Sequence, residues 1–161
     1  MEISSEPGQG SQAILSVPLQ KFRKQWCSKV MVVDTSALIA VLLDEPETQS
    51  FVRVLSDDPK KMISAFNALE SAVVIEAKKG EAGGRELDLL LHRARIEIIA
   101  LNGDQVELAL AAWRKFGKGN HPAGLNIGDC CAYALAKYSG EPLLFKGNDF
   151  SQTDIRPVID N

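Results

Sequence analysis

The chain has 161 residues, of which 45% are hydrophobic and 24% are charged, and it is therefore long enough for one domain with a substantial core. The formal net charge of −3 argues against binding of nucleic acid through a uniformly basic surface, but not against an acidic site with a basic rim. Three cysteines, two of them adjacent, do not suit a disulfide framework and fit a reducing compartment. No apolar run approaches the ~18 residues that span a bilayer, so we expect a cytoplasmic protein without membrane contact.

Residues 1–29 differ in character from the rest of the chain. They combine Ser, Gln, Gly and Pro with no sustained period, which predicts a flexible N-terminal extension. Met31 stands immediately before the core residues of the first predicted strand, and an over-long gene model would explain the stretch upstream of it. We expect the folded domain to occupy residues 30–161.

From Val30 onward, short apolar strands alternate with helices. The predicted strands, in chain order, are Val30–Val33, Lys61–Ile63, Ile96–Leu101, Pro142–Phe145 and a short Ile155–Val158. The predicted helices are Thr35–Leu43, Pro46–Leu55, Ala65–Lys79, Arg85–Ala94, Asp104–Phe116 and Ile127–Tyr138. This alternation predicts an α/β fold in which a short parallel sheet is covered by helices on both faces, a three-layer α/β/α sandwich.

The most informative residues are four acids: Asp34, Glu70, Asp129 and Asp149. Asp34 and Asp149 each follow a predicted strand, and the carboxyl ends of parallel strands share one edge of a sheet, where ligands bind. Three of the four acids, taken alone, also have a structural explanation. Asp34 suits a helix N-cap, Asp129 suits a capping box with Asn126, and Asp149 suits a turn.

Glu70 is harder to explain as a structural residue. It shares a helical face with the apolar Phe66 and Val73, where a carboxylate needs a partner or a cation. Four acids drawn together would repel one another unless a divalent cation shared them. Mg²⁺ prefers hard oxygen ligands, polarises phosphoryl oxygens and activates bound water, so the set indicates metal-dependent cleavage of phosphodiester bonds.

The segments around these acids resemble a known family. They are Asp34-Thr35-Ser36-Ala37-Leu38, Ala68-Leu69-Glu70, Leu125-Asn126-Ile127-Gly128-Asp129-Cys130 with Tyr133-Ala134-Leu135-Ala136, and Leu143-Leu144-Phe145-Lys146-Gly147-Asn148-Asp149-Phe150. In this order the chain is similar to the PIN-domain VapC toxins, from about Val30 to Val158. The resemblance implies a PIN-like α/β/α sandwich and a ribonuclease that is the toxic component of a type II toxin–antitoxin system.

The resemblance also implies a set of site residues and partners. By position, Asp34 and Asp129 would bind Mg²⁺, or Mn²⁺ in its place, and Glu70 and Asp149 would complete the catalytic set. The residues that would line the substrate site are Thr35, Ser36, Asn126 and Lys146. The implied partners are an RNA substrate, a cognate VapB-type antitoxin and a second copy of the chain in a homodimer.

Two other functions remain open at the level of sequence. A Mg²⁺-binding, phospho-accepting receiver-like signalling domain also has acids at strand ends and a Lys after a late strand, as Lys146 would be. It needs a pair of adjacent acids, however, and Thr35 follows Asp34. The second alternative is a non-catalytic RNA-binding PIN module, against which the four intact acids argue.

Overall fold

The sheet of this protein is short, parallel and four-stranded in the computed structural model, which describes residues 30–57 and 60–159. Its strands are β1 (Val30–Val33), β2 (Lys60–Ser64), β3 (Ile96–Ile99) and β4 (Leu143–Leu144), in the order β3-β2-β1-β4. Val32 of β1 pairs with Met62 on one side and with Leu143 on the other. The predicted parallel sheet is therefore confirmed.

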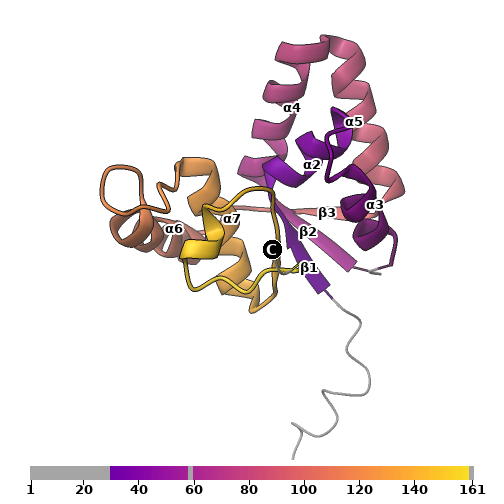
Figure 1. Ribbon diagram of the computed structural model, residues 1–161. Coiled ribbons are helices and arrows are strands. Elements are labelled where there is room, and N and C mark those ends of the chain that lie inside the picture. Colours follow the sequence, from indigo (N-terminus) through magenta and orange to yellow (C-terminus); the bar gives the residue numbers. More distant parts are fainter. Residues whose placement is uncertain (1–29, 58–59, 160–161) are drawn as a thin grey trace, which may run out of the picture.

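Helices cover both faces of this sheet (Figure 1). One face carries α2 (Thr35–Leu42), α3 (Thr48–Asp57), α4 (Ala65–Lys79) and α5 (Glu81–Arg93), and the other carries α6 (Gly103–Phe116) and α7 (Ile127–Ser139). Successive residues of a strand point to opposite faces. Accordingly, Met31 and Val33 belong to the core under α2–α5, whereas Val32 belongs to the core under α6 and α7.

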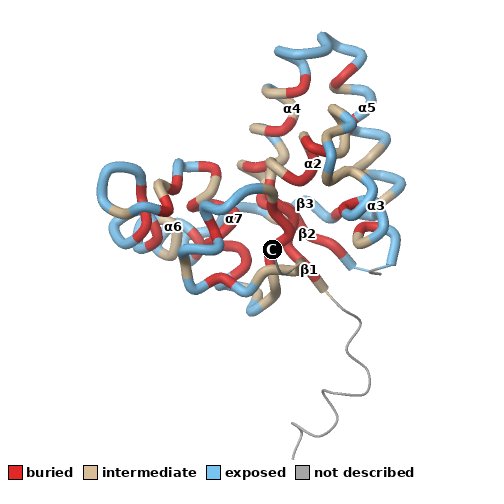
Figure 2. Tube along the Cα trace, in the orientation of Figure 1, coloured by how far each residue is buried: buried red, intermediate tan, exposed pale blue. Residues whose placement is uncertain are grey.

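The α4–α5 pair forms a hairpin that projects away from the sheet, and the tip of this hairpin is exposed (Figure 2). A β-carbon placed on Gly83 would lie 2.8 Å from the Ile75 carbonyl oxygen, so only a glycine allows this close approach of the two helices. The helix α5 begins at Glu81 and includes Gly83 and Gly84, whereas the sequence predicted its start at Arg85. Tertiary packing here outweighs the low helix propensity of glycine.

The boundaries of α4 are as predicted. The side chain of Ser64 caps its N-terminus by accepting from the Phe66 backbone N–H, and Gly80 ends it with a φ of 63°. The predicted final strand over Ile155–Val158 is wrong, because only an isolated bridge between Leu143 and Pro157 is present. Proline has no N–H to donate to a ladder.

Several sequence expectations concern other parts of the chain. The predicted extension over residues 1–29 lies outside the described residues. Across residues 30–57 and 60–159, no helix is long and apolar enough to cross a membrane. Cys130 and Cys131 are both buried in α7 and carry free thiols.

Candidate active site

Asp34 lies at the carboxyl end of β1 and is only 2% exposed. It is the N-cap of α2, and its Oδ2 accepts hydrogen bonds from the Ser36 backbone N–H at 2.9 Å and from the Ser36 hydroxyl at 2.6 Å. The Ser36 hydroxyl in turn accepts from the Lys146 backbone N–H at 2.9 Å. This chain of hydrogen bonds joins the end of β1 to the segment that follows β4, as expected for adjacent parallel strands.

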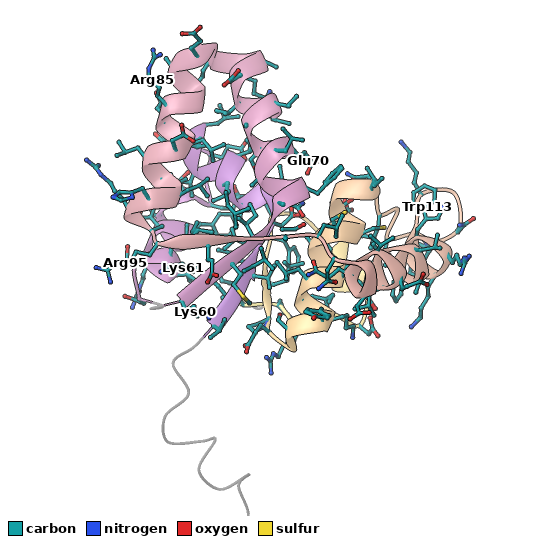
Figure 3. The ribbon with its side chains drawn as sticks, turned by 180° about the vertical axis from the view of Figure 1, so that it is seen from behind. Lys60, Lys61, Glu70, Arg85, Arg95 and Trp113 are labelled. Carbon is teal, nitrogen blue, oxygen red and sulfur yellow. The ribbon has the colours of Figure 1, made fainter. Side chains whose placement is uncertain are left out.

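Glu70 extends from the end of α4 nearest the sheet, on the side where α7 lies (Figure 3). Its Oε2 accepts a 2.6 Å hydrogen bond from the Thr35 hydroxyl. The predicted apolar face beside Glu70 is wrong at Val73, which is 61% exposed. The buried face of α4 consists of Asn67, Ser71 and Ile75, and Glu70 stands at its edge, half-buried.

The space for the Glu70 carboxylate comes from a glycine on α7. A β-carbon on Gly128 would lie 2.4 Å from Oε2 and 2.5 Å from Oε1 of Glu70. Gly128 is itself buried. Two residues that are 58 positions apart therefore meet across α4 and α7, with the carboxylate packed against bare backbone.

Asp129 is the third residue of α7 and takes part in a capping box. Its Oδ2 accepts from the Asn126 backbone N–H at 2.8 Å, and its own backbone N–H donates to Asn126 Oδ1 at 2.9 Å. Burial raises the pKa of Asp129 to about 7, assisted by the charges of Asp34, Asp149 and Glu70 and opposed by the Asn126 hydrogen bond. The Asp129 side chain thus completes the capping box of α7 and is also near enough to the other acids to be influenced by their charges.

Asp149 follows β4 in the turn before the short 3-10 helix η1 (Phe150–Gln152), and its side chain is exposed. Its negative charge contributes to the raised pKa of Asp129. The pKa of Asp34 is raised as well, mainly by burial and further by the charge of Glu70. The charges of acids from three other segments therefore act on Asp129, and that of Glu70 also acts on Asp34.

Lys146 takes a different position from the one predicted for a substrate-lining residue. Its ammonium group forms ion pairs with Glu45 and, at 3.2 Å, with Glu47, so only its backbone N–H reaches the site through Ser36. Asp154, a further acid of the C-terminal segment, accepts a 2.7 Å hydrogen bond from the Tyr133 hydroxyl. Neither Glu45 nor Asp154 is part of the group that influences Asp129.

Sequence reasoning did not identify two residues of this site, Asn67 and Gly128. Asn67 is fully buried and its amide contacts Asp34, Thr35, Glu70 and the Gly128 carbonyl. Its spacing of three residues from Glu70 on one helix was the available signal. Gly128 carried no such signal, because its role depends on the approach of another helix.

The donor set of the four acids fits a hard divalent cation. All the side-chain donors are oxygens, and the mutual repulsion of the acids would be relieved by positive charge. Within the described ranges, no three Asp, Glu, His or Cys side chains stand close enough to form a complete ligand cluster by themselves. Divalent cations such as Mg²⁺ commonly use one or two protein carboxylates and keep several waters, so a complete cluster of protein ligands is not required.

The class of the protein follows from comparison with known families: a family model described as the PIN domain matches residues 31–156. Two similar relatives, VapC ribonuclease Mb0640 of Mycobacterium bovis and ribonuclease VapC30 of Mycobacterium tuberculosis, are each 56% identical over 128 residues. These matches cover 80% of this chain and 98% of each relative. Ribonuclease VapC of Mycolicibacterium smegmatis is 54% identical, with 80% of this chain and 99% of that relative covered. The chain therefore belongs to the VapC family of PIN-domain ribonucleases.

Solved structures agree with this fold. The crystal structure of Mycobacterium tuberculosis VapC20, described as a Sarcin-Ricin loop cleaving toxin, has a TM-score of 0.67 at 16% identity. The match covers 80% of this chain and 98% of that one. VapBC2 from Rickettsia felis, bound to a DNA fragment from its promoter, has a TM-score of 0.62 at 14% identity and coverages of 80% and 96%. At these identities the likeness concerns the fold alone.

Proposed function

We propose that Asp34, Glu70, Asp129 and Asp149 form the catalytic site of this VapC ribonuclease, with Mg²⁺ as its ion and Mn²⁺ as a substitute. The ribonuclease activity and the role as toxin in a type II toxin–antitoxin system follow from membership of the family. One observation carries the assignment of the site: the buried Asn67 amide lies 3.4 Å from Asp34 Oδ1, 3.5 Å from Glu70 Oε2 and 3.1 Å from the carbonyl oxygen of Gly128, the residue before Asp129. The raised pKa of Asp129, to which the charges of the other three acids contribute, agrees with this assignment.

Within this proposal, Asp34 and Asp129 are the metal ligands. When bound, the ion would stabilise charge on the scissile phosphate and lower the pKa of a water molecule. Ser36 fixes the Asp34 carboxylate with two hydrogen bonds, and the Asn126 backbone N–H fixes that of Asp129. Both ligands are thus held before an ion arrives, which reduces the ordering that binding requires.

The remaining residues of the proposed site orient and line it. The Thr35 hydroxyl holds Glu70, and Asp149 is exposed and therefore accessible to substrate. Asn126, three residues before Asp129, is exposed as well. For Lys146 we propose support of Ser36 through the backbone, because its ammonium group is already engaged by Glu45 and Glu47.

The proposed partners are an RNA substrate, a VapB-type antitoxin and a second copy of the chain. Similar folds include a toxin–antitoxin complex from Klebsiella pneumoniae, with a TM-score of 0.58 at 19% identity. Action on RNA favours the cytoplasm as the place of activity. Family membership argues against the receiver-like domain and the non-catalytic module.

An exposed apolar groove supports the homodimer. It has a volume of about 420 Å³ and lies between α6 and α7. The groove is lined by Leu101, Val106, Ala109, Leu110, Trp113, Ile127, Cys130 and Cys131. None of these side chains is charged, and Ile127 and Trp113 are among the exposed large hydrophobic residues. We propose that a second copy covers this groove.

The experiment that tests the proposed site is RNA cleavage by the purified full chain. Cleavage is expected with Mg²⁺ or Mn²⁺ and not with a chelator, and Asp129→Asn is expected to abolish it with the circular dichroism spectrum retained. Expression of the chain should deplete cellular RNA, and co-expression of the cognate antitoxin should prevent the depletion. Full cleavage by Asp129→Asn, or uptake of phosphate from acetyl phosphate, would contradict the proposal.

A further inference from the structure

The residue with the most connections in the acidic site is not an acid. Asn67, the third residue of α4, is fully buried. Its side-chain nitrogen lies 3.1 Å from the Gly128 carbonyl oxygen, 3.2 Å from the Thr35 hydroxyl, 3.4 Å from Asp34 Oδ1 and 3.5 Å from Glu70 Oε2. One amide group therefore touches the N-terminus of α2, the start of α4 and the first turn of α7.

The four contacts compete for a limited number of hydrogens. An asparagine amide has two N–H donors, so it cannot satisfy four acceptors at full strength. All four distances exceed the usual 2.9 Å of an N–H···O bond, as expected for shared donors. The Thr35 hydroxyl links Asn67 to Glu70, because it accepts a hydrogen bond from the Asn67 amide and donates one to the Glu70 carboxylate at 2.6 Å.

The other end of the same amide has no partner. Among the described residues, Asn67 Oδ1 is a buried oxygen without a hydrogen bond. Reversing the amide would place this oxygen against the Gly128 carbonyl and two carboxylates, which would repel it, so these acceptors determine the orientation of the amide. A buried acceptor left unpaired is unfavourable, and packing alone would be served better by an apolar residue. The favourable contribution of Asn67 must therefore come from the N–H donors of its amide.

We infer that Asn67 is a positioning residue of the metal site: its amide holds the Asp34 carboxylate and, with Thr35, the Glu70 carboxylate in the arrangement that receives the divalent ion. This inference rests on the proposed function of the four acids. Each carboxylate oxygen has two lone pairs, so Asp34 and Glu70 can accept from Asn67 and still face a cation. Such outer partners of metal ligands determine both orientation and affinity.

The chain offers a matched control in Gln105. It is also fully buried, its side-chain nitrogen donates to the Ala100 carbonyl at 3.1 Å, and its Oε1 also lacks a partner among the described residues. It contacts none of the four acids through a hydrogen bond. Replacing Gln105 therefore reproduces the loss of a buried amide without touching the proposed metal ligands.

The first measurement is calorimetric titration of the metal-free full chain with Mg²⁺ and with Mn²⁺. Asn67→Leu is expected to weaken binding of the ion about 10- to 100-fold, as removal of outer partners does elsewhere. Gln105→Leu is expected to bind the ion like the unsubstituted chain. A folded Asn67→Leu variant with unchanged ion affinity would overturn the inference.

The second measurement uses Asn67→Asp, which keeps the side-chain shape and replaces the donor by another carboxylate. Its melting temperature without ions is expected to fall, and the rise on adding Mn²⁺ is expected to exceed that of the unsubstituted chain, because the ion neutralises the added charge. Gln105→Glu is expected to show no such extra rise. Equal rises in the two variants would overturn the inference even if Asn67→Leu does not fold.

Failure of the proposed function has a separate signature. If the unsubstituted chain binds no divalent ion, or if Asp129→Asn binds it equally well, the proposed metal site is wrong. The inferred role of Asn67 is then wrong too. If Asp129→Asn loses the ion while Asn67→Leu keeps it, the metal site stands and only the role of Asn67 is overturned.

Discussion

The carboxylate of Glu70 occupies the place where Gly128 would carry a side chain, since a β-carbon there would lie 2.4 Å from Oε2. Contacts of this length do not occur between stable neighbours, so any other residue at position 128 must displace either α7 or the carboxylate. The position of the Glu70 carboxylate therefore depends on the lack of a side chain at position 128.

The first prediction concerns Gly128→Ala. An alanine within a helix normally stabilises it by about 0.5–1 kcal/mol relative to glycine. Here the added methyl group should displace Glu70 and lower RNA cleavage by at least about 10-fold, in line with loss of precise positioning at an active site. Gly103→Ala is the control, because a β-carbon there meets nothing within 4 Å. Equal activities of the two variants would contradict this account of Gly128.

The second prediction concerns the pH dependence of stability. The pKa of Asp129 is raised from 3.8 to about 7, so the metal-free folded state holds a proton that the unfolded state has lost. Between about pH 4 and pH 7 the unfolded chain binds fewer protons, and the free energy of unfolding should therefore fall as pH rises, by at most about 1.4 kcal/mol per unit for one such group. Asp34, whose pKa is also raised, acts in the same direction.

Urea denaturation at pH 5 and pH 7 with a chelator present checks this slope. Asp129→Asn should have a smaller slope, because it removes one of the titrating groups and leaves an acceptor for the Asn126 backbone N–H. Addition of Mg²⁺ at pH 7 should restore stability to the unsubstituted chain. A slope that is identical in both proteins would mean that Asp129 ionises normally.

The third prediction separates structural acids from those of the site. Asp154 accepts from the Tyr133 hydroxyl and pairs with Lys137 at 3.1 Å. Tyr133→Phe should lower the free energy of unfolding by about 1 kcal/mol, the usual worth of one hydrogen bond, and leave RNA cleavage unchanged. Urea denaturation and a cleavage assay on the same preparation test both parts. A loss of cleavage without a loss of stability would place Asp154 in the mechanism.

The fourth prediction concerns the groove between α6 and α7. Leu110 lines it and is exposed, so Leu110→Glu should place a charge in the proposed dimer interface and shift the protein toward monomer in sedimentation velocity. Val52→Glu on α3 is the control, because Val52 is equally exposed but lies over the opposite face of the sheet. A Leu110→Glu variant that remains dimeric but escapes inhibition by the antitoxin would assign the groove to the antitoxin instead.

Local signals in the sequence were sufficient for much of the fold. Ser64 and Gly80 mark the two ends of α4, and the alternation of apolar strands with helices defines the parallel sheet. The start of α5 was missed because its glycines predict a break, and only the close approach to Ile75 explains them. The final strand was predicted from apolar residues, although Pro157 has no N–H for a ladder.

The site was predictable to the extent that it depends on strand ends and flanking residues. Asp34 and Asp129 belong to local patterns, so both their positions and their caps could be anticipated. The roles of Asn67 and Gly128 could not, because they arise from contacts between helices that are distant in sequence. The same is true of Lys146, whose ammonium group meets Glu45 from a position 101 residues further along the chain.

The order of the strands has a consequence for the timing of activity. The first strand of the described chain, β1, lies between β2 and the last strand, β4, and β4 leads directly to Asp149. During synthesis, one edge of β1 stays unpaired until β4, more than 100 residues further along the chain, has emerged from the ribosome. A nascent chain therefore holds Asp34 and Glu70 well before the fourth acid can join them. On the proposed assignment of the site, a ribonuclease that is toxic to its own cell completes its active site only after β4 and the segment with Asp149 have been translated.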